Sequence, residues 1–336
     1  MIKAGIIGAN GYTGFELLRI LGRHGEAKVT AAASRSNAGT PVADLYPALK
    51  STYGDMLFCD ADISLFTDCD VCFTALPHAA SAEIGGILHD AGVKVIDLSA
   101  DFRYDSLRLY EQTYGVNHPR PELNEKAVYG LPELFRDKIA GADIVGNPGC
   151  YTTASILALY PLIKENVIGR NGIIIDAKSG VTGAGRKADV GYSYCETADN
   201  FKAYGVTTHR HTSEIEEKLG VTLSFTPHLL PVKRGILATV YADCSSDADA
   251  VQAAYDKYYS GEPFVSASTA LPELKWVRGS NCCRIGYKLD KRLGKIIIIS
   301  VIDNLIKGAS GQAVQNMNIM FGLDETQGLE PIGEYL

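Results

Sequence analysis

The sequence predicts an α/β protein in which a Rossmann-type doubly wound parallel sheet is joined to a second α/β domain with a largely antiparallel, mixed sheet. A short apolar strand at residues 4–7 is followed by a glycine-rich turn and an amphipathic helix at residues 15–21. In the second half, residues 221–225, 236–242, 285–289 and 295–302 alternate or run apolar, and Gly294 marks a hairpin loop. The length of 336 residues suggests about two domains.

Composition and charge narrow the class of protein. The chain is 46% hydrophobic and 21% charged, and its formal net charge of −7 argues against non-specific nucleic-acid binding. The longest aliphatic run, residues 296–299, is far too short to span a membrane, and Met1 leads straight into a strand without a signal segment. The eight cysteines have no disulfide-like spacing. Cys69 and Cys72 form a C-x-x-C motif without a second pair for zinc, so we interpret them as structural and expect a reducing cytoplasm.

The first glycine-rich turn predicts a dinucleotide site. Its spacing is G-x-x-G-x-x-G, and the strand before it and the helix after it are the context that such a site requires. Glycines allow the backbone to approach a pyrophosphate at the helix N-terminus. The alternative is a turn that binds nothing. The candidate cofactor residues here are Gly8, Asn10, Gly11, Tyr12, Thr13 and Gly14.

The end of the second strand, residues 28–33, indicates which dinucleotide is bound. NAD-specific folds place an acidic residue here for the ribose hydroxyl, whereas this chain has Ser34, Arg35 and Ser36. An arginine between two serines suits a 2′-phosphate, so we expect NADP(H). The alternative is an arginine in a solvated loop.

Further parallel strands are expected at residues 71–74 and 93–98, with a helix at 79–91 between them. Ligands of doubly wound sheets bind at the carboxyl ends of the strands, where Leu76, Pro77 and Arg103 lie. Arg103 either holds a phosphate or carboxylate or pairs with Asp97 or Asp101. Residues 110–134 are expected to form a long polar and aromatic connection.

Cys150 is the candidate nucleophile. A strand at residues 142–146, a tight turn at Asn147, Pro148 and Gly149, and a helix at 152–165 place it at a helix N-terminus. Unpaired N–H groups and the helix dipole lower the pKa of a thiol there and can hold an oxyanion. The alternative is a small buried hydrophobic residue.

Other candidate residues lie in the second half. After a strand at 172–177, residues 179–186 form a mobile-looking glycine loop. His209 and His211 are two apart in an expected extended segment, so they should face the same way. Ser213 and Glu216 predict a capping box that starts a helix. Residues 226–228 are expected between strands, Lys233 and Arg234 either bind an anion or are solvated, and a helix at 313–321 follows a loop at 304–311.

An NADP site together with a cysteine at a helix N-terminus indicates thioester redox chemistry. The thiolate attacks an activated acyl group, hydride from NADPH reduces the thioester, and an aldehyde is released. A free carboxylate would be a poor substrate because oxide is a poor leaving group. An acyl phosphate releases phosphate, which suits the spare arginines.

Six motifs, taken together, resemble the N-acetyl-gamma-glutamyl-phosphate reductase family over almost the whole chain. They are residues 8–14, 97–103, 146–151, 179–185, 209–211 and 311–318. The resemblance implies NADPH-dependent reduction of N-acetyl-glutamyl 5-phosphate to its semialdehyde, with release of phosphate, in arginine biosynthesis. It also implies an NADP-binding domain of residues 1–149 with 309–336 and a catalytic and dimerisation domain of residues 150–308, as in aspartate-semialdehyde dehydrogenases.

Carried over by motif, Cys150 is the nucleophile and His211 the acid/base, with His209 and His228 as alternatives. We assign Leu76, Pro77, Gly183 and Asn316 to the cofactor in addition to the turn and the serine–arginine segment. We assign Arg103, Asn147, Ser179 and His209 to the substrate, no residue to a metal, and a homodimer or homotetramer as the assembly. Reduction of N-acetyl-aminoadipyl or aspartyl phosphate is an alternative activity, and a non-catalytic NADP-sensing regulator is an alternative class.

Overall fold

The computed structural model describes residues 1–186 and 188–335, which divide into two compact units. The first unit comprises Met1–Gly149 and Ala309–Leu329, and the second comprises Cys150–Gly308 and the residues from 330 onward. The last residues join the second unit because the Asn281 N–H donates to Glu330 O and the Glu334 N–H donates to Arg278 O. The expected first domain, residues 1–149 with 309–336, therefore differs from the first unit in these final residues.

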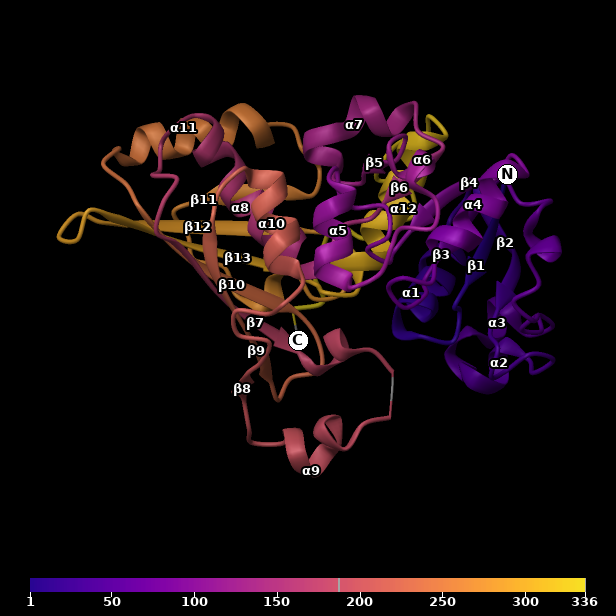
Figure 1. Ribbon diagram of the computed structural model, residues 1–336. Helices are drawn as coiled ribbons and strands as arrows, with labels where there is room; N and C mark the ends of the chain where they lie inside the picture. The colour runs from indigo at the N-terminus through magenta and orange to yellow at the C-terminus, as the bar shows by residue number, and fades with distance from the viewer. Residues whose placement is uncertain (187, 336) are drawn as a thin grey trace. The chain divides into compact units, whose positions relative to one another are not determined.

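The first unit is built on a parallel sheet, which can be followed in Figure 1. In the described residues it has six strands in the order β2-β1-β3-β4-β6-β5. Their bounds are β1 Ile2–Ile7, β2 Ala27–Ala33, β3 Val71–Thr74, β4 Lys94–Asp97, β5 Val128–Tyr129 and β6 Ile144–Gly146. The order reverses beside β1, so the carboxyl ends of β1 and β3 form the switch point where doubly wound sheets bind ligands.

The first unit also contains α-helices. They are α1 Tyr12–Leu21, α2 Val42–Leu45, α3 Lys50–Tyr53, α4 Ala82–Asp90, α5 Leu107–Tyr114, α6 Pro121–Asn124, α7 Pro132–Ala140 and α12 Gly311–Met320. Helix α12 packs against α1, α7 and β4, and all ten of its residues are buried. It follows a π-helical turn, Ile306–Ser310, where the sequence suggested only a loop.

The segment 110–134 is not the irregular connection that the sequence suggested. It contains α6, β5, most of α5 and the start of α7. Ser106 accepts the Leu109 N–H and starts α5, and Gly115 ends it with a left-handed conformation at φ +70°. Pro121 and Pro132 open the next two helices, a position where proline is favoured.

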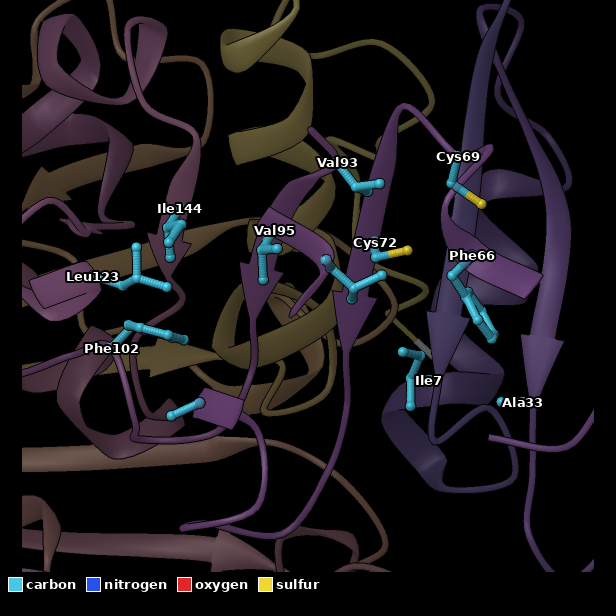
Figure 2. Close-up of a cluster of buried hydrophobic side chains, with 12 residues drawn as sticks. Ile7, Ala33, Phe66, Cys69, Cys72, Val93, Val95, Phe102, Leu123 and Ile144 are labelled. Atoms are coloured by element: carbon cyan, nitrogen blue, oxygen red, sulfur yellow. The ribbon is translucent and has the colours of Figure 1, made fainter. Parts of the chain in front are cut away.

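Apolar side chains on one face of the parallel sheet form a core cluster, shown in Figure 2. Phe66, Val95, Phe102 and Ile144 come from different segments and are almost completely buried. Burying a side chain of this size contributes about 1.5–3 kcal/mol, so the cluster is a main source of stability for the first unit. Cys69 and Cys72 also belong to it.

The second unit contains a mixed sheet. In the described residues it has seven strands in the order β11-β12-β13-β10-β7-β9-β8. Their bounds are β7 Ile173–Gly180, β8 Lys202–Ala203, β9 Leu223–Leu230, β10 Ile236–Asp243, β11 Val265–Ser268, β12 Cys283–Asp290 and β13 Lys295–Ile302. The pairs β7–β9 and β11–β12 are parallel, and the other pairs are antiparallel. Residues 226–228, expected between strands, lie inside β9.

One face of this mixed sheet is covered by α8, Cys150–Lys164, which packs on β10 and β13. Helices α10, His211–Leu219, and α11, Ala248–Tyr259, pack against α8, and the short helix α9 is Tyr194–Thr197. Beneath α8 the side chains of Val240, Ile296 and Ile298 are fully buried. On the opposite face Tyr241 and Ile297 are only half-buried.

Candidate active site

The turn between β1 and α1 needs glycine for two close approaches. Gly8 has φ +92°, and a β-carbon on it would lie 2.3 Å from Ala75 O. A β-carbon on Gly14 would lie 2.6 Å from the backbone of Ala9. Helix α1 has no side-chain cap at Gly11 among the described residues, so no side chain at the cap accepts from its first N–H groups.

The serine–arginine segment at the end of β2 is joined to this turn. Asn10 Nδ2 donates to Ser36 Oγ at 3.0 Å, and the hydroxyls of Ser34 and Ser36 both donate to Asn37 Oδ1. Arg35 is exposed, and within the described chain its guanidinium makes no hydrogen bond or ion pair. The structure thus brings two of the predicted cofactor segments together and leaves a cation beside them.

The loop after β3, which carries Leu76 and Pro77, is held by Asp101. This buried carboxylate accepts the N–H groups of Ala79, Ser81 and Ala82 at 2.7–3.0 Å and so caps α4. The sequence interpretation treated Asp101 as a possible partner of Arg103 and missed this role. Ala79 adopts φ +64°, a left-handed conformation that costs a non-glycine residue about 1 kcal/mol.

A buried polar network joins Arg103, Asn147 and Asn316 in the first unit. Arg103 is 4% exposed, and its guanidinium donates to Asn147 O at 2.7 Å and to Leu98 O at 2.8 Å. Asn316 Nδ2 donates to Asn147 Oδ1 at 3.1 Å and to Gly130 O at 2.9 Å. Arg103 therefore holds the loop that leads from β6 toward Cys150.

Asn316 also has a buried acceptor without a partner in the described residues. Its amide orientation is fixed by the two acceptors of its Nδ2, and its Oδ1 is buried without a hydrogen-bond partner in the described residues. A buried amide oxygen without a partner is costly, by about 1–3 kcal/mol. A ligand donor, such as a carboxamide N–H, would remove that cost.

In the second unit Cys150 is the first residue of α8 and is half-buried. A β-carbon on Gly308 would lie 2.8 Å from Cys150 Cβ, so this glycine lets the backbone run beside the cysteine. The first residue of a fifteen-residue helix is where its unpaired N–H groups and positive dipole end are located. Cys150 is therefore placed where a thiolate is stabilised.

Aromatic rings surround the residue that follows Cys150. Tyr151 makes edge contacts with His209, His211 and Phe225, with ring centroids 5.3–6.0 Å apart. Its hydroxyl accepts from Tyr204 Oη at 3.1 Å and donates to the backbone oxygen of His228 at 3.2 Å. Burial raises the pKa of Tyr151, so this hydroxyl keeps its proton. The cluster fixes the histidine rings in the second unit.

His209 and His211 lie together, with ring centroids 4.8 Å apart, but not in an extended segment. His211 begins α10, and its N–H donates to His209 Nδ1 at 3.1 Å. Burial, with the nearby charge of Arg210, lowers the pKa of His209 to about 4. His209 is therefore neutral near pH 7, with its proton on Nε2, and it positions the first turn of α10.

The expected capping box at Ser213 and Glu216 is wrong. The Ser213 hydroxyl donates to Arg210 O, and the Glu216 carboxylate accepts the Leu223 N–H. His209 supplies the acceptor for the first turn, so α10 starts three residues earlier than the capping box implied. His228, the third candidate histidine, has its Nδ1 3.1 Å from Asp176 Oδ1 and 3.3 Å from Ala177 O.

The glycine loop after β7, which the sequence suggested to be mobile, is held by hydrogen bonds. It forms a short 3₁₀ turn, Val181–Ala184, in which Thr182 Oγ1 donates to Lys233 O and accepts from Asn304. Ser179 is buried at 2% exposure, and a β-carbon on Gly183 would lie 2.8 Å from its hydroxyl. The close approach of Ser179 to residue 183 explains why residue 183 is a glycine.

Arg234 is engaged in an ion pair. Its Nε lies 2.8 and 2.7 Å from the two carboxylate oxygens of Asp303, which is fully buried and also accepts the Gly279 N–H. This ion pair gives Arg234 a structural role in place of the solvated loop that was one of the two alternatives left open by the sequence.

Among the residues that the structure describes, no helix is both long and apolar enough to cross a membrane. The same residues contain no group of three or more His, Cys, Asp or Glu side chains that could hold a metal ion.

Comparisons with known proteins match both halves of the chain. The model of the semialdehyde dehydrogenase NAD binding domain matches residues 3–142, and that of the semialdehyde dehydrogenase dimerisation domain matches residues 150–304. The N-acetyl-gamma-glutamyl-phosphate reductase of Caldicellulosiruptor saccharolyticus is 51% identical over 344 residues, covering 100% of both chains. That of Geobacter sulfurreducens is 50% identical over 341 residues, covering 98% of both.

Solved structures show the same fold. Aspartate semialdehyde dehydrogenase II of Vibrio cholerae has a TM-score of 0.73 at 19% identity, covering 96% of this chain and 98% of the other. The aspartate semialdehyde dehydrogenase of Candida albicans, solved with NADP, has a TM-score of 0.67 at 18% identity and the same coverage. At these identities the likeness establishes the architecture alone.

Proposed function

The chain belongs to the N-acetyl-gamma-glutamyl-phosphate reductase family, and on this premise we propose how its residues perform the reaction. The enzyme uses NADPH to reduce N-acetyl-L-glutamyl 5-phosphate to N-acetyl-L-glutamate 5-semialdehyde and phosphate, a step of arginine biosynthesis. The observation that carries the assignment is similarity over the full length of curated relatives. The activity named for these relatives favours the glutamyl substrate over aminoadipyl or aspartyl phosphate and favours an enzyme over a sensor.

Cys150 is the nucleophile of this proposal. Its thiolate attacks the acyl carbon and forms a thioester as phosphate leaves. The position of Cys150 at the start of α8 supports the role, because the adjacent N–H groups stabilise both the thiolate and the oxyanion of the tetrahedral intermediate. NADPH, when bound, supplies the hydride that reduces the thioester.

His211 is the acid/base. It donates a proton to the oxygen that becomes negative when the thioester is reduced and removes it when the aldehyde is released. Its ring lies against Tyr151, the neighbour of Cys150, and its backbone is fixed by His209. His209 is a weaker candidate because burial keeps its ring neutral, and His228 because its Nδ1 faces Asp176.

The first unit has features that fit NADP(H). Gly8 to Gly14 would hold the pyrophosphate, Ser34 to Ser36 the 2′-phosphate, and Asn316 the nicotinamide amide. Leu76, Pro77 and Gly183 complete the proposed cofactor residues. Arg103, Asn147, Ser179 and His209 remain the proposed substrate residues.

We assign cofactor binding to residues 1–149 with 309–336 and catalysis and subunit contact to residues 150–308, in a cytoplasmic homodimer or homotetramer. The uncovered face of the mixed sheet supports the assembly, because Tyr241, Ile297 and Ile299 are half-buried there and Ile174 is 45% exposed. Light scattering of Ile297→Lys against the native chain tests this surface. An unchanged molar mass would contradict it.

The decisive experiment separates the nucleophile from the fold. Cys150→Ser should bind NADPH and lose nearly all reduction, since a serine hydroxyl stays protonated. The native enzyme mixed with acyl phosphate alone should release about one phosphate per site in a burst. Mass spectrometry should find the acyl group on the peptide with Cys150. Cys195→Ser, at an exposed cysteine, is the matched control and should behave as native. Normal turnover of Cys150→Ser would refute the mechanism.

A further inference from the structure

Two thiols of the first unit meet beside Gly5 on β1. Cys72 Sγ lies 2.7 Å, and Cys69 Sγ 3.1 Å, from the position that a β-carbon on residue 5 would take. Both sulfur atoms therefore occupy space that only glycine leaves open. Figure 2 shows the two residues in the core cluster with their sulfur atoms pointing to the same side.

The two thiols differ in their surroundings. Cys69 is 7% exposed, and its sulfur is 3.5 Å from the hydroxyl of Thr30, an exposed residue of β2. Cys72 is completely buried in β3. The Cys72 thiol lowers the pKa of Cys69 to about 7, against the effect of burial, while its own pKa is raised. Cys69 is thus the less deeply buried of the two cysteines, and its lowered pKa favours its thiolate over that of Cys72.

We propose that Cys69 and Cys72 form an oxidisable dithiol, in which Cys69 reacts with a peroxide and Cys72 closes the disulfide. The pair is separate from every residue of the proposed reaction, so this inference does not depend on the proposed function. A metal centre is a poorer use of the motif, because the described residues offer no third ligand beside the pair.

The chemistry balances with hydrogen peroxide as the oxidant. The Cys69 thiolate attacks one peroxide oxygen, the O–O bond breaks, and sulfenic acid and hydroxide result. The Cys72 sulfur then attacks the Cys69 sulfur. The S–O bond breaks, and the leaving hydroxide takes the Cys72 proton as water. One thiolate and one thiol are oxidised to one disulfide, and one peroxide is reduced to water and hydroxide.

Peptide mapping of the full-length chain tests the pair. The background variant Cys150→Ser keeps the proposed nucleophile from consuming peroxide. Cleavage on the amino side of aspartate separates Cys69 from Cys72 at Asp70 and leaves Cys59 on a third peptide. After mild peroxide treatment we expect the Cys69 and Cys72 peptides to stay joined and to separate on addition of dithiothreitol.

Two variants test the order of the steps. In Cys72→Ser, Cys69 should accumulate as sulfenic acid that dimedone traps. In Cys69→Ser, labelling of Cys72 should be at least about tenfold lower, because its thiol is not ionised near pH 7. If either variant does not fold, the native chain should still show Cys69 alkylated about tenfold faster than Cys72 at pH 7. Separate peptides after peroxide, or equal labelling of both cysteines, would overturn the proposal.

Discussion

His209→Asn should change how the stability of the second unit depends on pH. In the folded chain His209 has a pKa of about 4, lowered from 6.5 chiefly by burial among aromatic rings. Because the pKa of His209 is lower in the folded chain, His209 of the unfolded chain binds a proton first as the pH falls. The stability tied to the neutral ring is therefore fully present above pH 6.5 and is lost as the pH falls from 6.5 through 4.

The size of the effect follows from the two pKa values. The depression corresponds to about 3 kcal/mol at most, and partial exposure of the ring brings it nearer 1–2 kcal/mol. Asparagine cannot ionise, and its side-chain oxygen can replace Nδ1 as the acceptor for the His211 N–H. The native chain should thus lose about 1–2 kcal/mol relative to His209→Asn between pH 7.5 and 4.5.

Trp276 makes the measurement specific to the second unit, because it is the only tryptophan of the chain. Urea unfolding followed by its fluorescence at several pH values gives the free energy of unfolding for both proteins. His209→Leu is the contrasting variant, since it also removes the acceptor and should cost about 1–3 kcal/mol at every pH. A constant difference between native and His209→Asn across this range would refute the reasoning.

Three further predictions concern other residues. Arg35→Ala should weaken NADPH binding about tenfold to a hundredfold and leave NADH nearly unchanged, because only NADPH has a 2′-phosphate; equal losses in titrations of both would remove the assignment. His211→Asn should lower turnover about 10²–10⁴-fold with NADPH affinity retained, whereas near-native turnover would move the role to another histidine. Ala79→Gly should relieve the left-handed conformation and raise Tm by about 1–3 °C in a thermal melt, and a lower Tm would show that the strain estimate fails.

Strongly periodic segments could be predicted from the sequence. The strand, glycine turn and helix at residues 2–21 follow from apolar spacing and from the glycines, and both are local properties. Cys150 at a helix start follows equally from the Asn147-Pro148-Gly149 turn. Residues 110–134 were misjudged because α6 and β5 are too short to show a period.

The other differences between the structure and the expectations from the sequence arise from tertiary contacts. Residues 226–228 were expected between strands, yet they lie in β9. Pro227 is tolerated there because the neighbouring strand β8 is only two residues long and needs few backbone donors from β9. The α10 start depends on a histidine ring as acceptor, which no sequence pattern encodes. The cap that Asp101 gives to α4 joins residues about 20 apart, so it is invisible until β3 and β4 are neighbours.

The position of α12 has a consequence for the order in which the chain can fold during synthesis. The first unit needs residues 309–329 to cover α1 and α7 and to supply Asn316, but these are translated after the whole of residues 150–308. The N-terminal sheet therefore lacks α12, and part of its core stays exposed, until most of the second unit has been synthesised as one continuous segment. A ribosome stalled after residue 308 would carry a first unit without α12, with the surfaces of α1 and α7 that this helix covers open to a chaperone.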